Sequence, residues 1–311
     1  MRKIDLFNIE KYTIDTSNFN NVIHDGVTEF EEKFADYVGA KHACGVNSAT
    51  NAIFLALLDK NTTVTIPTMI PPVVANAILT SRNKLKFNDD RNWVGSCYTL
   101  HEFNDYKIID SAQQCERDIF KKEANPEDLM IFSFYPTKPV GSIDGGMIVS
   151  NDKDKIDHFR KMVLNGMSFN HNNWERKIEF PGYKFYLNSV QAFIASKNLD
   201  KLDEKNRILT DIRNEYNSKF NLDNTSGHLY RINSKNRAWF IEQMKSDGIT
   251  CGIHYECLHN HPAYKSDDKC HYSELLSQYT VSIPFHEKLT EKDVEHIIKK
   301  TEKYESIIDR T

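Results

Sequence analysis

Hydrophobic and polar residues alternate along the first half of the chain with two periods, one typical of helices and the other of strands. Phe30, Phe34 and Val38 recur every four residues, which predicts a helix over 27–38 with one apolar face. Residues 49–58 are apolar nearly all round, so we expect a buried helix there. Other helices are predicted at 73–81 and 154–164, and short strands at 64–67, 106–110, 130–135 and 146–150.

Short apolar strands separated by helices are the pattern of an α/β fold. Such strands predict a mainly parallel central sheet that is buried on both faces by helices. The pattern changes at a polar stretch, 168–184, which is typical of a linker. A long helical pattern follows over 189–220, so we expect two domains, residues 1–170 and residues 171–311.

Composition and charge narrow the classes of function. The 311 residues include 40 lysines and arginines against 44 acidic residues, a formal net charge of −4. Binding to nucleic acid or to an anionic membrane needs a basic face, so neither partner is expected. The longest apolar stretch, 52–58, is far shorter than the ~20 residues that cross a bilayer. Because no hydrophobic leader is visible and the six cysteines form no CxxC pair, we expect a cytoplasmic protein with reduced thiols.

Three segments combine residues that could carry chemistry. In the first, small residues precede the apolar helix at 49–58, so Ala49 and Thr50 would offer backbone N–H groups at a helix N-terminus. Such an end binds phosphate through those donors and the helix dipole. An ordinary N-cap by Ser48 or Thr50 explains the same residues equally well, and this segment alone does not separate the two interpretations.

The other two segments hold an acid and a lysine. Asp110 ends the strand predicted at 106–110, where α/β sheets collect ligands, although an acid there is more often a helix cap. Lys138 lies in a loop between two buried strands, a loop that is no P-loop because the lysine precedes the glycines. A lone loop lysine is usually solvated. A lysine that is buried away from solvent has a lowered pKa, and the neutral amine can then react with an aldehyde.

A phosphate-binding helix end, an acid at a strand end and a lysine between strands are together the parts needed to hold pyridoxal 5′-phosphate. In this arrangement the chain resembles the DegT/StrS-type sugar-nucleotide aminotransferases, which are pyridoxal-phosphate enzymes of fold type I. The most specific match is FSFYPTKPVGSIDGGMIVSND at 132–152. The other matching segments, in chain order, are 37–57, 108–114, 181–203, 228–232, 248–264 and 283–294.

The resemblance implies a large cofactor-binding domain at 1–170 and a smaller α+β domain at 171–311 that begins with a long connecting helix. It also implies roles for individual residues. Lys138 matches the lysine that binds the cofactor as an internal aldimine and then moves the substrate proton. Asp110 matches the acid that faces the pyridine nitrogen, and Gln113 the glutamine beside the cofactor hydroxyl.

The remaining implied roles concern the phosphate, the partner subunit and the reaction. Ser133, Ala49 and Thr50 match the phosphate cup, and Lys184 matches a residue that reaches the phosphate from the neighbouring subunit. A homodimer with a shared active site is therefore implied. The implied reaction moves an amino group, from glutamate, to a nucleotide-linked keto-deoxysugar in two half-reactions. The alternative is a protein of the same fold that binds the cofactor without turnover, as a regulator or partner subunit.

Two departures from the family pattern keep that alternative open. Pro71 occupies the place where relatives carry an aromatic residue that stacks on the cofactor ring, so Met69 or Ile70 would have to cover that face. The segment 79–110 is shorter than in relatives. We expect a strand–helix unit there to be missing or shortened, which would leave a smaller sheet.

A second group of reactive side chains lies near the C-terminus. These side chains are cysteines and histidines, and zinc prefers four such ligands in a tetrahedron. The spacing of these cysteines and histidines matches no established zinc motif, so no metal is predicted. The alternatives are cysteines that fill small apolar spaces, or a substrate-lining role for His254 or His259. The group consists of Cys251, His254, Cys257, His259, His261, Cys270 and His271.

Overall fold

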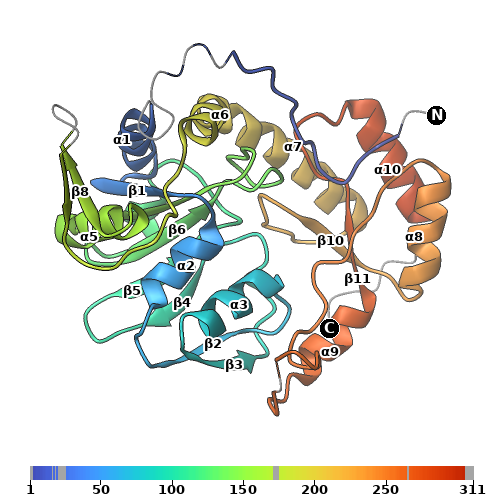
Figure 1. The fold of residues 1–311 in the computed structure, drawn as a ribbon. Coiled ribbons are helices and arrows are strands. Elements are labelled where there is room, and N and C mark those ends of the chain that lie inside the picture. Colours follow the sequence, from blue (N-terminus) through green and yellow to red (C-terminus); the bar gives the residue numbers. More distant parts are fainter. Residues whose placement is uncertain are drawn as a thin grey trace.

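The computed structural model describes residues 3–15, 17, 19, 26–170, 175–264 and 266–304 (Figure 1). Its helices are α1 (Val27–Val38), α2 (Ala49–Leu57), α3 (Pro72–Thr80), α4 (Ile119–Glu123), α5 (Lys153–Val163), α6 (Ser189–Leu199), α7 (Leu202–Phe220), α8 (Arg237–Ser246), α9 (His271–Tyr279) and α10 (Glu291–Tyr304). Its strands are β1 (His42–Val46), β2 (Thr63–Pro67), β3 (Lys84–Asn88), β4 (Tyr98–Glu102), β5 (Lys107–Asp110), β6 (Leu129–Ser133), β7 (Gly146–Ser150), β8 (Met167–Asn170), β9 (Glu175–Ile178), β10 (Tyr230–Asn233) and β11 (Thr280–Ile283).

The helices and strands expected in the first half of the chain are confirmed, each within two residues of its expected bounds. The helical pattern at 189–220 is divided into α6 and α7, because residues 200–201 interrupt it. The expected linker at 168–184 contains the antiparallel pair β8–β9. A domain boundary at residue 170 stays a prediction, and residues 187–202 share a hydrophobic cluster with α1 and the central sheet.

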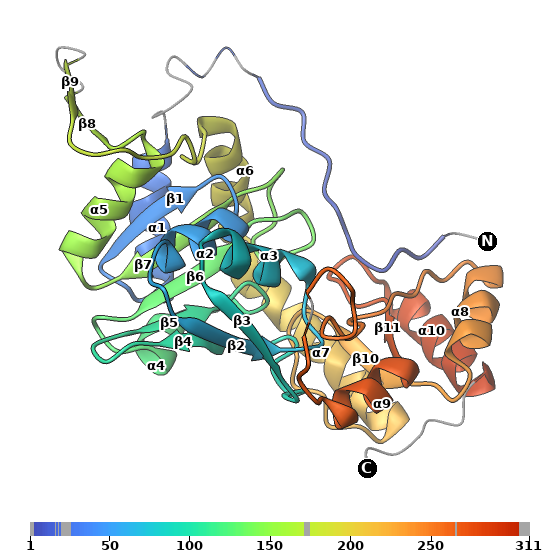
Figure 2. The ribbon, with the colours of Figure 1, turned by 60° about the horizontal axis from the view of Figure 1, so that its bottom comes forward.

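The central sheet corrects one expectation from the sequence. The α/β fold is confirmed, but the five-stranded sheet, in the order β1-β7-β6-β5-β4, is mixed and not mainly parallel (Figure 2). β5 and β6 run parallel, whereas β1–β7, β6–β7 and β4–β5 pair antiparallel. The short turn between β4 and β5 reverses the chain, whereas the parallel pair β5–β6 is joined by a longer crossover that contains α4. A second, two-stranded parallel sheet is formed by β2 and β3.

The segment between β3 and β5 is the part of the fold that was expected to be shortened. Residues 89–106 are all described and contain β4 but no helix. A tight hairpin joins β4 to β5, with the Phe103 amide donating to the Tyr106 carbonyl oxygen at 2.8 Å. A hairpin without a helix therefore occupies this segment, and the absence of a strand–helix unit found in relatives stays a prediction.

Alternate residues of the central strands pack against helices on opposite faces of the sheet. Ile131 and Ile148 belong to a hydrophobic cluster with α2, α3 and α5. Met130 and Val149, their neighbours along the strands, belong to a second cluster with α1, α4 and α6. The expectation that helices bury the sheet on both faces is therefore confirmed, and burial on both sides explains why these strands are apolar throughout.

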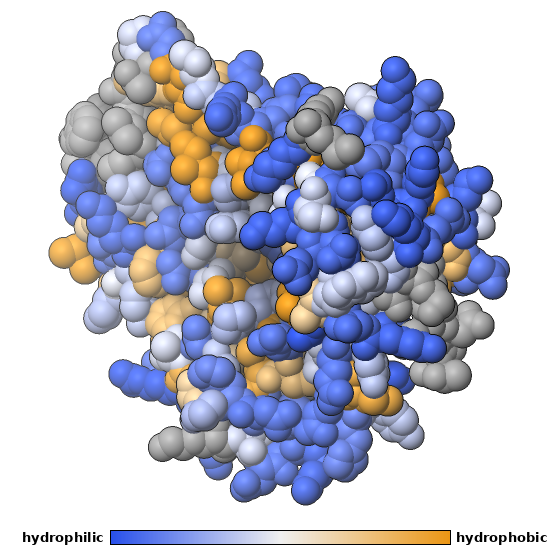
Figure 3. All heavy atoms as spheres, turned by 90° about the vertical axis from the view of Figure 1, so that its right-hand side faces the viewer, coloured by the Kyte–Doolittle hydropathy of each residue, from blue (hydrophilic) through white to orange (hydrophobic). Residues whose placement is uncertain are grey.

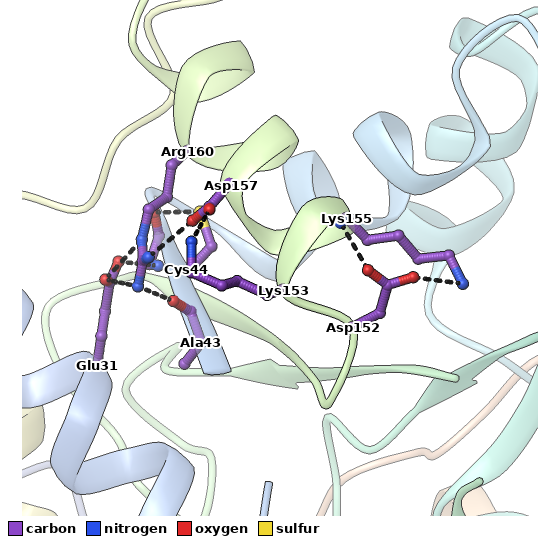
Figure 4. Close-up of polar contacts among 9 residues, drawn as sticks. Glu31, Ala43, Cys44, Asp152, Lys153, Lys155, Asp157 and Arg160 are labelled. Atoms are coloured by element: carbon purple, nitrogen blue, oxygen red, sulfur yellow. Dashed lines mark hydrogen bonds and ion pairs between the residues drawn. The ribbon is translucent and has the colours of Figure 1, made fainter. Parts of the chain in front are cut away.

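An ion pair between the buried Glu31 and the partly exposed Arg160 connects the helices on the two faces through β1 (Figure 4). The Glu31 carboxylate, on α1, accepts from the Gly45 amide at 2.6 Å and pairs with Arg160 of α5 at 2.9 Å. Arg160 also donates to the Ala43 carbonyl oxygen at 2.7 Å. Burial raises the pKa of Glu31, and the guanidinium of Arg160 opposes that change. The pair fixes one edge of the sheet against its helices.

The C-terminal part of the chain extends from α7 to α10. In it, α7, α8 and α10 surround the antiparallel pair β10–β11 (Figure 1). Its hydrophobic cluster includes Tyr216, Phe240 and Ile297, and Ile4 of the N-terminal segment joins it. The Ile4 amide donates to Gly248 and its carbonyl oxygen accepts from Thr250, at 2.8 and 2.9 Å. The N-terminal segment therefore begins on the C-terminal part, from which the chain continues to α1 and the sheet.

The side of the molecule on which α8 and α10 lie is mostly hydrophilic, with hydrophobic side chains in separate groups (Figure 3). α10 is consistent with this pattern, since it buries Val294, Ile297 and Ile298 while most of its charged residues are exposed. Within the described part of the chain, no helix has both the length and the apolar character that a bilayer span requires.

Candidate active site

A cavity of about 540 Å³ lies where β5 and β6 end, beside the first turn of α2. The N-terminal segment reaches it through Phe7, and the C-terminal part closes it with His228, His254 and Tyr255. The sequence-predicted site residues that line it are Ala49, Thr50, Asp110, Gln113, Ser133, Lys138 and His254. Segments far apart in the sequence thus meet around one space of the size that small-molecule sites have.

The first turn of α2 forms one end of the cavity. Ser48 is the N-cap, since its hydroxyl accepts from the Asn51 amide at 3.2 Å. The first N–H groups of a helix have no partner within it, so those of Ala49 and Thr50 are available to an anion. Gly146 lets β7 pass this turn closely, because an added Cβ would lie 2.6 Å from the Ala49 nitrogen. The Ser48 cap is confirmed, and anion binding by the Ala49 and Thr50 amides, which is compatible with it, stays a prediction.

Asp110 is the last residue of β5, and its side chain is 4% exposed. One carboxylate oxygen accepts from the Ala112 amide at 2.9 Å, and the other accepts from the Tyr98 hydroxyl at 3.0 Å. Burial raises the pKa of Asp110, while these two hydrogen bonds and the charge of Lys138 oppose the rise. The site therefore holds a carboxyl group whose charge is compensated by fixed partners.

Gln113 is held by partners on both sides of its amide. Its oxygen accepts from the Gly95 amide at 2.8 Å, and its nitrogen donates to the Tyr255 hydroxyl at 2.8 Å. Gly95 has a φ of +85°, and an added Cβ there would lie 1.8 Å from the Ser226 hydroxyl. The turn at residue 95 consequently has to be glycine, and it connects the cavity wall to the C-terminal part.

Lys138 lies in the turn that follows β6, where its amide donates to the Tyr135 carbonyl oxygen at 2.8 Å. Burial in the cavity lowers the pKa of Lys138 to about 8, against an ordinary 10.5, and the Asp110 carboxylate opposes the change. A substantial fraction of this amine is therefore neutral near pH 8. A neutral amine has the lone pair that reaction with an aldehyde requires.

Two histidines on the C-terminal wall are kept neutral. Burial lowers the pKa of His254 to about 4, and the charge of Lys138 adds to the effect. Burial likewise holds the pKa of His228 well below its ordinary value. His254 is hydrogen bonded to the Ser282 hydroxyl at 2.9 Å, and Phe7 stacks on His228 with ring centroids 5.7 Å apart. This wall offers hydrogen bonds without a positive charge.

Two residues proposed from the sequence lie away from the cavity lining. Lys184 is exposed, in the extended segment before α6. His259 is buried between the Thr68 hydroxyl, at 2.6 Å, and the Glu274 carboxylate, at 2.9 Å. It thereby connects the end of β2 to α9.

A zinc site needs several ligand side chains close together. The described residues contain no group of three or more His, Cys, Asp or Glu side chains that could hold a metal ion.

Aromatic residues from an unexpected segment form part of the cavity wall. Pro71 and Ile70 line the cavity, whereas Met69 is fully buried elsewhere. Trp93 also lines it, stacked on Tyr255 with ring centroids 6.0 Å apart and planes within 10°. The cavity thus has an aromatic wall although position 71 is proline.

Several lining residues were not predicted as site residues. Tyr255 and His228 lie within segments that carry the family resemblance, so their positions beside assigned residues were the available signal. Phe7, Trp93 and Tyr98 have no such signal. Their place in the cavity depends on how the N-terminal segment and the β4–β5 hairpin fold back onto the sheet.

The residues of this cavity fit pyridoxal 5′-phosphate. The start of α2 suits its phosphate, the buried Asp110 carboxylate suits a protonated ring nitrogen, and the Lys138 amine suits its aldehyde. Gln113 and Ser133 add neutral hydrogen-bonding groups between them. The lining residues therefore match the phosphate, the ring nitrogen and the aldehyde of the cofactor.

Comparison with known proteins points to one family. The model of the DegT/DnrJ/EryC1/StrS aminotransferase family matches residues 10–90 and 108–302. The chain is 26% identical to the UDP-4-amino-4,6-dideoxy-N-acetyl-beta-L-altrosamine transaminase of Campylobacter jejuni, with 87% of each chain covered. It is 24% identical to the GDP-perosamine synthase of Caulobacter vibrioides, with 88% of each covered.

The fold is similar to that of solved aminotransferases. Helicobacter pylori PseC, an aminotransferase involved in the biosynthesis of pseudoaminic acid, gives a TM-score of 0.77 at 18% identity. The match covers 96% of this chain and 98% of that one. The family model leaves residues 91–107 unmatched, and this gap contains Trp93, Tyr98 and the β4–β5 turn. The unmatched segment therefore includes β4 and the turn that leads to β5.

Proposed function

Because this chain belongs to the DegT/DnrJ/EryC1/StrS aminotransferase family, we propose that it transfers an amino group to a nucleotide-linked keto-deoxysugar. Glutamate is the proposed donor, and pyridoxal 5′-phosphate is the proposed cofactor of the two half-reactions. The observation that carries this proposal is that Lys138, Asp110 and the first turn of α2 share one cavity. The two curated relatives are named for a UDP-linked and a GDP-linked sugar, so the proposal names the class and not the nucleotide.

Three features of the cavity have proposed tasks in this reaction. When bound, pyridoxal 5′-phosphate supplies an aldehyde and a ring that takes up electrons from the substrate carbon. The first turn of α2 binds the phosphate, and the Asp110 carboxylate holds a proton on the ring nitrogen. Lys138 anchors the aldehyde at rest and, once displaced by substrate, moves the proton of the substrate carbon. Acid–base catalysis of this kind contributes roughly 10²- to 10⁴-fold.

The wall formed by the C-terminal part is the proposed place for the sugar. His228 and His254 are neutral at physiological pH, so they bind hydroxyl groups through hydrogen bonds and do not attract a carboxylate. Phe7 and Tyr255 add apolar surface beside them. A sugar ring, which carries hydroxyl groups above an apolar face, suits such a wall.

A homodimer with shared active sites is part of the proposal. Lys184 is exposed and is not among the residues that line the cavity of its own chain. An exposed lysine in this segment is available to a neighbouring copy, where it would add a positive charge at the cofactor phosphate. We therefore propose that two copies complete each other's phosphate cup.

The proposed function has a direct test in the protein loaded with pyridoxal 5′-phosphate. Adding glutamate is expected to remove the visible absorption band of the bound cofactor and to release 2-oxoglutarate in a stoichiometric amount. D-glutamate is the control. A band that persists unchanged while the cofactor stays bound would contradict an aminotransferase and favour a cofactor-binding protein without turnover.

Covalent capture of the cofactor should depend on pH as the pKa of Lys138 dictates. Only the unprotonated amine reacts, so the rate rises with pH and levels off above about pH 8, the pKa of Lys138. We expect an increase of about tenfold between roughly pH 7 and pH 9. Stopped-flow absorbance of the apoprotein mixed with pyridoxal 5′-phosphate measures it. Free N-acetyl-lysine, whose pKa is ordinary, should continue to accelerate beyond that range, and identical profiles would contradict the assignment.

A further inference from the structure

The β4–β5 hairpin places a tyrosine, Tyr98, beside the carboxyl end of β5. If the strand next to β5 ran parallel to it, the last residue of that neighbouring strand would lie next to Asp110. β4 runs antiparallel, so its first residue lies there, and the register pairs Tyr98 directly with Asp110. This arrangement follows from the segment 91–107, which the family model leaves unmatched.

The contact between the two side chains is a hydrogen bond within the cavity wall. The Tyr98 hydroxyl donates to Asp110 Oδ2 at 3.0 Å, while the Ala112 amide donates to Oδ1 at 2.9 Å. Two donors on different oxygens fix the plane of the carboxylate. Burial, followed by the Asp110 charge, holds the pKa of Tyr98 well above its ordinary value, so the phenol keeps the proton that it donates.

Tyr98 is itself held in place by neighbours from the same segment. The Trp93 ring contacts it edge-on, with centroids 5.1 Å apart, and stacks in turn on Tyr255. The Gly95 and Cys97 amides donate to the side chains of Gln113 and Gln114, at 2.8 and 2.9 Å. The segment is therefore attached to the strand-end residues at several points, and its position relative to Asp110 is well determined.

We propose that Tyr98 is a positioning residue that orients the Asp110 carboxylate toward the cofactor ring nitrogen and stabilises its charge. This inference rests on the proposed function. Each carboxylate oxygen can accept more than one hydrogen bond, so the bonds from Tyr98 and Ala112 leave capacity for a protonated ring nitrogen. Without the phenol, the buried carboxylate would lose one of the partners that favour its ionised form, and the ring nitrogen would lose part of its counter-charge.

The test compares Tyr98→Phe with Tyr106→Phe in the full-length protein. Tyr106 belongs to the same hairpin, at the end away from Asp110, where its ring packs on Phe103. We expect Tyr98→Phe to raise the Kd for pyridoxal 5′-phosphate about tenfold, as loss of a hydrogen bond to a charged group does. The visible band of the bound cofactor should change in position or in the ratio of its components. Tyr106→Phe should match the wild type in both measurements.

A double variant separates an effect through Asp110 from a general structural one. If Tyr98 acts through that carboxylate, Tyr98→Phe adds little to Asp110→Asn, and the two effects on Kd are not additive. Additive effects, or a Tyr98→Phe protein with the Kd and spectrum of the wild type, would overturn the inference while leaving the proposed function intact. A wild-type protein that retains no cofactor would overturn both.

Discussion

Replacing Lys138 by alanine is expected to abolish covalent capture of pyridoxal 5′-phosphate and to lower turnover by about 10³-fold or more. The amine has two tasks in the proposed reaction, as covalent anchor and as the group that moves the substrate proton, and no other lysine lines the described cavity. Borohydride treatment followed by peptide mapping measures the first task. The wild type should carry the label on the peptide that contains Lys138, and Lys138→Ala should carry none.

Lys205 is the matched control for that variant. Burial lowers the pKa of Lys205 as well, but its amine is directed to the Pro139 carbonyl oxygen, at 3.0 Å, and does not line the cavity. A Lys205→Ala protein should still be labelled at Lys138. If the label in the wild type were found on Lys205, a lowered pKa alone would select the reactive lysine and the roles assigned to the cavity would fail.

The second large effect is expected from Asp110→Asn. An opposite charge near a titratable group shifts its pKa by roughly 1–3 units, so removing it should lower turnover between about tenfold and a thousandfold. Asparagine keeps the size of the side chain and the oxygen that accepts from Ala112. Because burial raises the pKa of Asp110, a neutral amide is less costly to bury. The apoprotein is therefore expected to lose no stability, as measured by urea unfolding, while steady-state turnover falls.

Asp128→Asn should lower the stability of the protein and leave turnover per folded molecule unchanged, which is the opposite of the result expected for Asp110→Asn. Asp128 is 1% exposed at the start of β6, and its two oxygens accept from the Lys107 and Asn125 amides, each at 2.7 Å. Asparagine has one acceptor oxygen, so a buried N–H loses its partner and the protein loses about 1–3 kcal/mol of stability. The absorption spectrum of the bound cofactor should not change. Equal losses of turnover per folded molecule in both variants would contradict the role of Asp110.

The residues that the sequence identified well are those whose role depends on their immediate neighbours. Asp110 follows an apolar strand, Lys138 lies in the turn after the next strand, and Ala49 begins an apolar helix. In an α/β fold the carboxyl ends of adjacent strands and the starts of the following helices lie on one edge, so such residues meet. Local pattern and general topology were therefore enough to bring them together.

His254 and His259 show where local pattern was insufficient. Both lie in one cysteine- and histidine-rich segment, and the sequence alone assigned them the same substrate-lining role. The structure directs His254 into the cavity and buries His259 between Thr68 and Glu274. The two rings differ in their partners from distant strands and helices, which residue spacing does not specify.

By itself, the sequence determined the α/β class and the extents of the helices and strands that it predicted in the first half of the chain, and it proposed Lys138, Asp110 and the start of α2 as site residues, because hydrophobic periodicity and strand-end chemistry are local properties. The tertiary structure decided the direction of β4, which the short segment 79–110 left open, and with it the pairing of Tyr98 with Asp110. It also decided that Phe7 and Trp93 enter the cavity. Strand pairing and the packing of distant segments depend on contacts between residues far apart in the sequence. Such contacts form when the whole chain folds, so the local sequence pattern does not specify them.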